Sequence, residues 1–422
     1  MLINNWPRVP ITDVISFIVD NRGKTVPTAE SGFPLIATNC VLNERLYPVY
    51  EKIRYVSDEI YQSWFRAHLA PNDILFVNKG TPGRCCLVPD PVPFCAAQDM
   101  IGLRCDNKKV YYRYLLMVLR SPEIQKKIQN YHVGLAIPHF KKEDLPQLVI
   151  PLPSMEEQRI IGDLYFELCE AVENNISICA ELEAMSKLLY DYWFVQFDFP
   201  DENGKPYKSS GGKMVWNEQL KREIPEGWIV SPLSNYLNCN QNTITQNNLG
   251  EYIAYLDTGS LTENVIDQIQ TINRSEGLPS RARRVVKEND ILYSTVRPIQ
   301  KHYGIIKHPV ENMIASTGFA VLSATQGSSY NELFYLFITS EVNLRILDAI
   351  ANNSVSSYPS INPDDILNLR IALPPDLTSL RELCRKLQNC YEMIDAEQKE
   401  NKVLEQLRDF LLPMLMNGQV KV

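Results

Sequence analysis

The sequence is poor in features typical of membrane, secreted and metal-binding proteins. None of its apolar runs approaches the roughly 18 residues that a membrane-spanning helix requires. Its first ten residues lack a basic segment followed by an apolar one, so no secretory signal is expected. The ten cysteines form no CxxC pair, and the five histidines complete no zinc-ligand spacing. We therefore expect a cytoplasmic protein with reduced cysteines, no bound zinc and no membrane partner.

Sequence signatures of catalysis are missing as well. The chain contains no complete GxxxxGK[ST] or GxGxxG phosphate-binding loop, and neither GxSxG nor HExxH occurs. The adjacent carboxylates Asp364 and Asp365 follow "SINP", which indicates a helix start and not an acid/base pair. Asp73 and Asp290 each precede a β-type run, where a carboxylate that accepts backbone amides of a turn is expected. The sequence thus predicts no catalytic, cofactor or metal site in this chain.

The net charge of −8 argues against nucleic-acid binding only if the charge is spread evenly. Residues 1–153 hold 18 Lys and Arg against 14 Asp and Glu, a net charge of +4. Residues 154–194 hold 2 against 9, a net charge of −7. Because the acidity is concentrated in one segment, phosphate binding by the first part of the chain stays open.

The main feature of the sequence is an internal duplication. "NDILF" at positions 72–76 recurs as "NDILY" at positions 289–293. "KEDLPQLVIPLP", which ends at Pro153, recurs in the second half of the chain as "PDDILNLRIALP". A tryptophan with a proline four positions after it occurs at Trp6 and again at Trp228. Landmarks in the same order at nearly one offset indicate two copies of a domain of about 220 residues, with small shifts from loop insertions.

Both copies follow one plan. Each opens with short β-type runs separated by Gly, Pro and Asn, and closes with a polar segment that carries an apolar stripe. Proline-rich junctions, "IPLPSMEEQ" and "LPPDLTS", mark the helix starts. The predicted fold is α+β, with two similar mixed α/β domains separated by two long antiparallel coiled-coil helices in a pseudo-twofold internal repeat. The predicted boundaries are 1–153 for the first domain, 154–195 for the first helix, 196–227 for a linker, 228–375 for the second domain and 376–422 for the second helix.

The closing segments fit a heptad pattern. About 35 residues at about 1.5 Å each would make a rod of roughly 50 Å. Two arrangements stay open: each helix packs against its own domain, or the two helices pack on each other, with polar Asn175 and Glu397 setting the register. The second is favoured. Proline at position 413 is expected to end or kink the second helix. The residues predicted to pack the helices or to dock partners are Ile161, Leu164, Leu168, Asn175, Ile178, Leu182, Leu189, Leu383, Leu404 and Leu411.

A strand, a polar loop and a second strand recur in both copies. "ILFVNKGTPGRCCLV" and "ILYSTVRPIQKHYGIIK" keep the framework and change the loop, as expected of two modules that read different surfaces. Lys and Arg beside Asn, Thr and His are donors suited to phosphates and base edges. A solvated hairpin tip is the simpler interpretation of one such loop, but two matched loops favour recognition. The predicted DNA-binding residues are Thr38, Asn39, Asn78, Lys79, Thr81, Arg84, Arg281, Arg283, Arg284, Thr295, Arg297, Lys301 and His302.

Two stretches carry a resemblance to a known family. "LVIPLPSMEEQRII" is similar to the junction between a target-recognition domain and a spacer helix in specificity subunits of type I restriction–modification systems. The stretch "FDFPDENGKPYKSSGGKMVWNEQLKREIPEGWIV" at 197–230 resembles the segment that joins the two halves of that family. The resemblance implies a non-catalytic subunit with two target-recognition domains, each reading one half of a bipartite, asymmetric site in double-stranded DNA. It also implies that the helices dock two methyltransferase subunits and, through them, restriction subunits. S-adenosylmethionine, ATP and Mg would then bind those partners and not this chain.

Two other classes of function compete with this interpretation. An enzyme with an unrecognised signature would show activity as a purified chain with S-adenosylmethionine or magnesium. A duplicated scaffold that binds only protein would show no salt-dependent affinity for duplex DNA.

Overall fold

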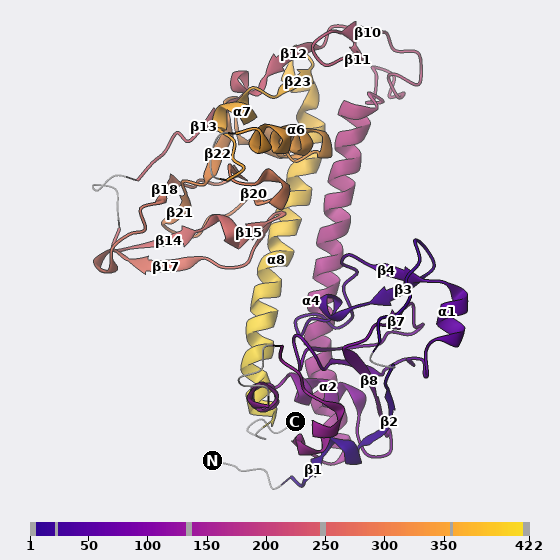
Figure 1. Ribbon diagram of the computed structural model, residues 1–422. Coiled ribbons are helices and arrows are strands. Elements are labelled where there is room, and N and C mark those ends of the chain that lie inside the picture. Colours follow the sequence, from indigo (N-terminus) through magenta and orange to yellow (C-terminus); the bar gives the residue numbers. More distant parts are fainter. Residues whose placement is uncertain (1–5, 22–23, 132–136, 245–249, 355–357, 417–422) are drawn as a thin grey trace. The chain divides into compact units, whose positions relative to one another are not determined.

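The computed structural model describes residues 6–21, 24–131, 137–244, 250–354 and 358–416 (Figure 1). The chain divides into two compact units, one formed by residues 1–176 and 399–422 and the other by residues 177–398. Both boundaries fall inside long helices, so each unit holds one set of sheets and half of each helix. No helix in the described ranges is long and apolar enough to span a membrane.

Unit 1 is built on three small sheets. β1 (Arg8–Pro10) pairs with β9 (Val149–Pro151) in a two-stranded antiparallel ribbon. The four-stranded sheet has the order β2 (Ile15–Val19), β8 (Met100–Cys105), β5 (Ile74–Val77), β6 (Cys85–Leu87). The three-stranded sheet has the order β4 (Arg54–Val56), β3 (Phe33–Ile36), β7 (Cys95–Ala96), and β3 and β7 are parallel. Three helices accompany the sheets: α1 (Asp58–Ser63), α2 (Tyr112–Arg120) and α3 (Pro122–Asn130).

Unit 2 repeats this plan with additions. β12 (Ile229–Pro232) pairs with β23 (Arg370–Leu373). One four-stranded sheet has the order β13 (Leu237–Cys239), β22 (Phe319–Ala324), β19 (Asp290–Ser294), β20 (Tyr303–Ile306). The other has the order β17 (Gln270–Asn273), β14 (Tyr252–Leu256), β21 (Met313–Ser316), β18 (Ala282–Val285), with β14 and β21 parallel. The additions are β18, the hairpin β15 (Leu261–Thr262) with β16 (Val265–Ile266), and the linker hairpin β10 (Met214–Asn217) with β11 (Arg222–Pro225).

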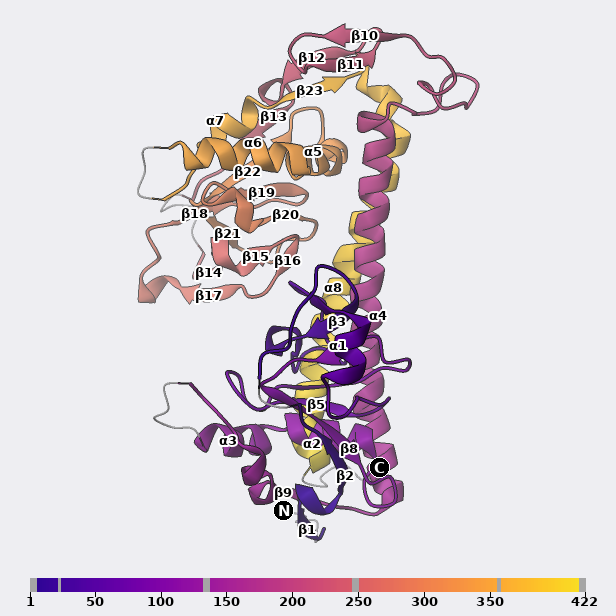
Figure 2. The ribbon, with the colours of Figure 1, turned by 45° about the vertical axis from the view of Figure 1, so that its right-hand side comes forward.

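The helices of unit 2 cover one of its sheets. They are α5 (Asn331–Ile338), α6 (Glu341–Asn352) and α7 (Pro363–Leu367). Figures 1 and 2 both show α6 and α7 next to each other beside β22. α7 begins with a capping box in which Asn362 and Asp365 exchange side-chain and backbone hydrogen bonds, so the helix start predicted from "SINP" is confirmed.

The matching strand registers confirm the internal repeat. Ile74 of β5 lies opposite Leu103 of β8, and Ile291 of β19 lies opposite Leu322 of β22. In both units the sheet order, the antiparallel pairing of the hairpin and one parallel pair in the second sheet are the same. Two copies of one domain therefore account for the repeated stretches "NDILF" and "NDILY".

The repeated aspartates hold the turn before the central strand. Asp73 Oδ2 accepts a hydrogen bond from the Ala70 amide at 2.8 Å, and Asp290 Oδ2 accepts one from the Lys287 amide at 2.7 Å. Asp73 also forms an ion pair with Arg104 at 2.8 Å. The predicted turn-stabilising role is thus confirmed in both copies.

The two long helices have equal lengths. α4 (Met155–Tyr190) continues into a π-helical turn, Asp191–Val195, and α8 (Arg381–Met416) follows a 3-10 turn. Ser154 caps α4: its hydroxyl accepts from the Glu157 amide, and the Glu157 carboxylate accepts from the Ser154 amide at 2.9 Å. α8 runs through Pro413 to Met416, so of the two expected effects of this proline, an end of the helix or a kink, the first does not occur. A proline near the last turn removes only one backbone donor, which the packing of Leu412 and Leu415 offsets.

The helices pack antiparallel within each unit. In unit 1, Asn401 Nδ2 donates to the Val172 carbonyl at 3.4 Å, and in unit 2 the Cys179 thiol donates to the Ile394 carbonyl at 3.8 Å. In each unit the two helix segments also pack against the sheets of that unit. In unit 1, for example, Leu412 and Leu415 of α8 and Tyr165 of α4 belong to the same core as the strands. Both arrangements left open by the sequence therefore occur together. Gly162 allows α4 to pack closely against α2 in unit 1, because a Cβ at this position would lie 2.7 Å from the Tyr114 amide nitrogen of α2.

The predicted helix-packing residues are only partly buried. In unit 1, Ile161 and Asn175 are buried, Leu164 and Leu411 pack against the core, and Leu168 and Leu404 are half-buried. In unit 2, Leu383 is buried, while Leu182 and Leu189 pack against the core. Ile178 is 38% exposed and joins no core cluster of the described residues, so of its two predicted roles only partner docking stays a prediction. The true stripe of α8 follows Leu387, Tyr391 and Ile394, which are all buried.

Candidate nucleic-acid interface

The hairpin loop of unit 1, residues 78–84, is held by its backbone. The Val77 amide donates to the Arg84 carbonyl at 2.9 Å, and the Gly83 amide donates to the Val77 carbonyl at 3.0 Å. The Gly80 amide donates to the Pro138 carbonyl at 2.9 Å, and an isolated β-bridge joins Lys79 to the residue after that proline. Strand pairing on one side and the 137–140 segment on the other thus fix the loop.

The side chains of this loop differ in whether they are exposed and whether they have a partner within the protein. Thr81 is exposed and Arg84 is half-buried, and neither has a side-chain hydrogen bond or ion pair to another described residue. Lys79 Nζ lies 3.8 Å from Asp99, so a weak and half-exposed ion pair restrains it. The buried side-chain oxygen of Asn78 has no hydrogen-bond partner in the described part of the chain. Arg84 and Thr81 can therefore bind a ligand without losing an internal contact.

Thr38 and Asn39 lie in a 3-10 turn after β3 and not in the hairpin. Asn39 Nδ2 donates to the Glu51 carbonyl at 3.0 Å, so this amide holds the following loop. Thr38 is half-buried, and its carbonyl accepts from the Val41 amide. Neither residue shares a hydrogen bond with residues 78–84.

The hairpin loop of unit 2, residues 295–302, has the same two supports. The Thr295 amide donates to the Gly318 carbonyl, and the Arg297 amide donates to the Pro359 carbonyl at 2.9 Å. A second isolated β-bridge joins Val296 to the residue after Pro359. Pro138 and Pro359 occupy equivalent positions of the duplication, so the same segment holds the hairpin loop in both copies.

Arg297 is the most available cation of this loop. Its backbone is left-handed, with φ 47°, and its side chain is exposed. The guanidinium lies over the Tyr358 ring, 5.7 Å from the centroid, and Tyr358 is itself 63% exposed. An exposed arginine stacked on an exposed aromatic ring is a surface suited to bases and phosphates. Sequence reasoning missed Tyr358, although the matched Pro359 marks its segment.

Three predicted residues of this loop have structural partners instead. Lys301 Nζ forms an ion pair with Glu263 at 2.7 Å. His302 Nδ1 lies 2.7 Å from the Leu261 carbonyl and 3.1 Å from the Thr262 hydroxyl. The Thr295 hydroxyl donates to the Gly318 carbonyl at 3.0 Å. These contacts join the loop to the β15–β16 hairpin and to the turn between β21 and β22.

Three arginines, Arg281 just before β18 and Arg283 and Arg284 within it, lie near the base of the hairpin. The Thr317 amide donates to the Arg281 carbonyl at 2.8 Å, and the next residue, Gly318, accepts from Thr295, so Arg281 and the loop flank one turn. Arg281 and Arg283 are exposed, and Arg283 Nε donates to the Ser280 carbonyl at 3.2 Å. Arg284 is half-buried, and its Nε has no partner in the described ranges. The structure thus places Arg281 and the start of the 295–302 loop at the same turn, 317–318, while Arg284 is less exposed than Arg281 and Arg297.

Both long helices also present apolar side chains to solvent. In unit 2, Met185 is 52% and Leu188 is 64% exposed on α4. In unit 1, Val403 is 62% and Phe410 is 66% exposed on α8. Exposed apolar side chains on a long helix are candidates for contact with another polypeptide.

Comparisons with known proteins show which family of proteins this chain resembles. Residues 3–184 match the family model described as type I restriction modification DNA specificity domain. The chain is 26% identical over 321 residues, 74% of its length, to the type I restriction enzyme MjaIX specificity subunit of Methanocaldococcus jannaschii, of which it covers 70%. It is 21% identical to the putative type I restriction enzyme MjaX specificity subunit of that organism, over 99% of this chain and 94% of the relative.

Residues 3–184 thus carry the type I restriction modification DNA specificity domain, and the chain as a whole is similar to type I restriction enzyme specificity subunits. Its fold agrees with the crystal structure of a type I restriction–modification system S subunit from M. genitalium, with a TM-score of 0.61 at 16% identity, over 98% of this chain and 97% of that one. A specificity subunit recognises DNA for a multisubunit complex and is not its catalytic component. Within the described residues, no group of three or more His, Cys, Asp or Glu side chains could hold a metal ion.

Proposed function

We propose that this specificity subunit reads a bipartite, asymmetric target in double-stranded DNA. The domains at 1–153 and 228–375 each read one half, and the helices at 154–195 and 376–422, with the linker at 196–227, set the distance between the halves. The observation that supports this proposal most strongly is the pair of equivalent hairpin loops, residues 78–84 and 295–302. The two loops are held by equivalent backbone contacts but carry different side chains. A shared frame with altered donors is what reading two different base sequences requires.

Arg84 and Arg297 are the residues proposed to contact bases. Each lies at its loop and has no internal ion pair with a described residue. A bidentate contact of arginine with guanine contributes about 1–3 kcal/mol of discrimination. Thr81, Arg281 and Arg283 would supply contacts to phosphates nearby. Lys301, His302 and Thr295 would shape the second loop through the contacts described above.

We propose that the acidic helix α4 is repelled from DNA between the half-sites. Its carboxylates would oppose phosphates and attract basic partner helices. A helix of 36 residues is about 54 Å long at 1.5 Å per residue, comparable to about 16 base pairs of B-DNA. Base pairs between the two half-sites would then go unread.

The exposed apolar side chains of α4 and α8 are proposed to dock two methyltransferase subunits. Restriction subunits would join through those methyltransferases, and S-adenosylmethionine, ATP and Mg would bind to the partners. The complex would act on DNA in the cytoplasm. Met185, Leu188, Val403 and Phe410 support this because burial of such side chains favours association.

Genome-wide mapping of methylated bases tests the proposal. Cells expressing the methyltransferase with this chain should methylate a split motif that disappears without it. Arg84→Ala should relax one half of the motif and Arg297→Ala the other. Lys221→Ala is the matched control, because Lys221 is 73% exposed on the linker hairpin and pairs only with nearby Glu218 among the described residues. Both variants changing the same half, or no salt-dependent binding to duplex DNA, would contradict the proposal.

A further inference from the structure

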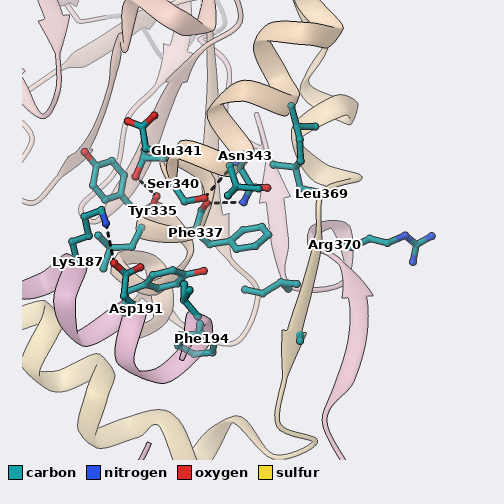
Figure 3. A pocket seen from close by; sticks show the side chains of 18 of the residues that line it. Lys187, Asp191, Phe194, Tyr335, Phe337, Ser340, Glu341, Asn343, Leu369 and Arg370 are labelled. Carbon is teal, nitrogen blue, oxygen red and sulfur yellow. Dashed lines mark hydrogen bonds and ion pairs between the residues drawn. The ribbon is translucent and has the colours of Figure 1, made fainter. Parts of the chain in front are cut away.

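Unit 2 contains an open cleft of about 860 Å³ between α4 and the second domain. Its walls come from the end of α4, from α5 and α6, from β20 and β23, and from α8. Figure 3 shows Lys187, Asp191 and Phe194 on the side of α4, facing Tyr335 and Phe337 of α5. A cleft of this volume has the size of a ligand site and not of a packing defect. No residue of the reading loop, 295–302, lines it.

The cationic side chains of this cleft are already in use. Lys187 forms an ion pair with Asp191 at 2.8 Å. Arg222 donates to the carbonyl of Phe194 at 2.9 Å and lies 4.5 Å from the centre of the Phe197 ring. Arg370 donates to Gln219 at 3.0 Å and points away from the cleft in Figure 3.

The carboxylates of the cleft outnumber its cations. Asp191 is paired with Lys187, and Glu263 is paired with Lys301 at 2.7 Å. Glu183 and Glu341 line the cleft without a hydrogen bond or ion pair to any residue of the described ranges. Burial raises the pKa of the Glu183 carboxyl to about 7, and the negative charge of Glu263 adds to this effect. A half-buried carboxylate without a partner is unfavourable, and a bound cation would stabilise it.

Three tyrosines complete the floor of the cleft. Tyr303, Tyr335 and Tyr391 are 7%, 5% and 2% exposed, and their hydroxyls make no hydrogen bond to another described residue. Their rings stack edge to face, with centroid distances of 6.0 Å for the first pair and 5.5 Å for the second. Because these tyrosines line an open cleft, their hydroxyls can form hydrogen bonds with a polar group that enters it. Aromatic rings beside carboxylates favour a cation.

The rim of the cleft is apolar and exposed. Val342 is 70%, Val195 is 50% and Ile346 is 44% exposed, and all three line the opening. Leu188, which follows the lining residue Lys187 on α4, is 64% exposed. An apolar rim around an acidic floor fits an amphipathic helix with one basic side chain, and it repels DNA, because the unpaired carboxylates oppose phosphates.

We infer that this cleft is an anchor site for a lysine or arginine side chain on an amphipathic helix of the methyltransferase subunit. The inference rests on the proposed docking of that subunit to the helices and adds the chemistry of one contact. The ammonium or guanidinium group would lie between Glu183 and Glu341, with tyrosine hydroxyls accepting its remaining donors. The apolar face of the partner helix would cover Val342 and Ile346.

Binding should depend on pH through Glu183. The charged form of Glu183 attracts the cation, so affinity should rise between pH 6 and pH 8 and a proton should be released on binding. The titratable groups that interact with Glu183 are Cys179, Glu263, Tyr303, Tyr335 and Tyr391. Lys187, Asp191 and Glu341 line the same cleft, and Lys301 pairs with Glu263.

The test measures binding of the purified methyltransferase subunit to the full chain at pH 6, 7 and 8. Glu183→Lys should weaken binding at least tenfold. Glu183→Gln should weaken it severalfold and remove the rise with pH. Glu181→Gln is the matched control, because Glu181 is exposed on α4 two residues away and does not line the cleft. Because glutamine removes a charge that burial disfavours, Glu183→Gln should fold, which thermal unfolding checks.

The outcomes separate this inference from the proposed function. If the wild-type chain binds the methyltransferase, and both Glu183 variants bind it with unchanged affinity and pH dependence, the anchor site is wrong while docking stands. If the wild-type chain does not bind at all, docking itself is wrong and the anchor with it. A Lys→Glu or Arg→Glu change in the partner that restores binding to Glu183→Lys would identify the inserted side chain.

Discussion

A buried ion pair in unit 2 allows a quantitative test of how the second domain is fastened to α8. Lys307, just after β20, is 2% exposed and lies 2.6 Å from Glu332 of α5, which is fully buried. Its ammonium also lies 3.1 Å from Glu392 of α8, which is 38% exposed. One lysine therefore joins the recognition hairpin, a domain helix and a long helix.

Replacing Lys307 by methionine should destabilise unit 2 by about 3–5 kcal/mol, the cost of leaving a buried charge without its partner. Without Lys307, the half-exposed Glu392 carboxylate can be solvated by water, but the fully buried Glu332 carboxylate cannot. Glu332 Oε2 already lacks a hydrogen bond among the described residues. Burial raises the pKa of Glu332, and the charge of Lys307 opposes that rise. Without Lys307 the pKa should rise further.

The pH dependence of the variant follows from that pKa. An acid whose pKa is raised by folding stabilises the folded state at low pH and loses this contribution as the pH rises through its folded pKa. Lys307→Met should therefore cost less at pH 5, where Glu332 can take up a proton, than at pH 8. Adding Glu332→Gln should recover most of the loss, because no charge is then left buried.

Urea-induced unfolding of the full chain at both pH values, with hydrogen exchange in β20 and α5, measures these effects. Lys127→Met is the control: its ion pair with Glu123 spans 2.8 Å, but both side chains are at least 36% exposed, so the loss should be under about 1 kcal/mol. A loss at pH 8 no larger for Lys307→Met than for Lys127→Met would refute the reasoning.

Two further predictions concern α4. Leu188→Glu should abolish binding of the methyltransferase in a sizing-column assay and leave thermal unfolding unchanged, because Leu188 is 64% exposed and belongs to no core cluster of the described residues; unfolding of the variant would contradict a docking role. Glu173→Gln should destabilise unit 1 by about 1.5–3 kcal/mol, because Glu173 accepts from Arg45 at 2.7 Å and from the Leu46 amide at 2.7 Å. Loss of recognition confined to the half-site read by the first domain would accompany it, and an unaltered melting curve would count against that contact.

Local signals in the sequence predicted the helix starts and the turns correctly. Ser154 with Glu157 marks the start of α4, and Asp73 and Asp290 hold the turns before the central strands. These features depend on residues within a few positions of one another, so the sequence contains all that determines them. The duplication is equally visible, because two copies of one fold keep their landmarks in order.

Side-chain partners were predicted less well. Lys301 and His302 have the composition of DNA contacts, yet both bind to residues 261–263, about 40 positions away. The predicted register of α8 was also wrong, because the heptad that contains Leu383, Leu404 and Leu411 continues through Met393 and Leu407, which are 50% and 42% exposed. Buried Leu387, Tyr391 and Ile394 lie four and three residues apart, so the buried stripe keeps a heptad spacing in a different register.

The sequence alone thus determined that one domain occurs twice, each time followed by a long helix, because patterns of polarity, turns and caps act over short distances. Only the tertiary structure decided which polar side chains are free to bind a ligand. Glu183 and Tyr391 lie more than 200 positions apart and line one cleft with Tyr335. Whether such groups are paired, buried or exposed depends on contacts between distant segments, which no local pattern records.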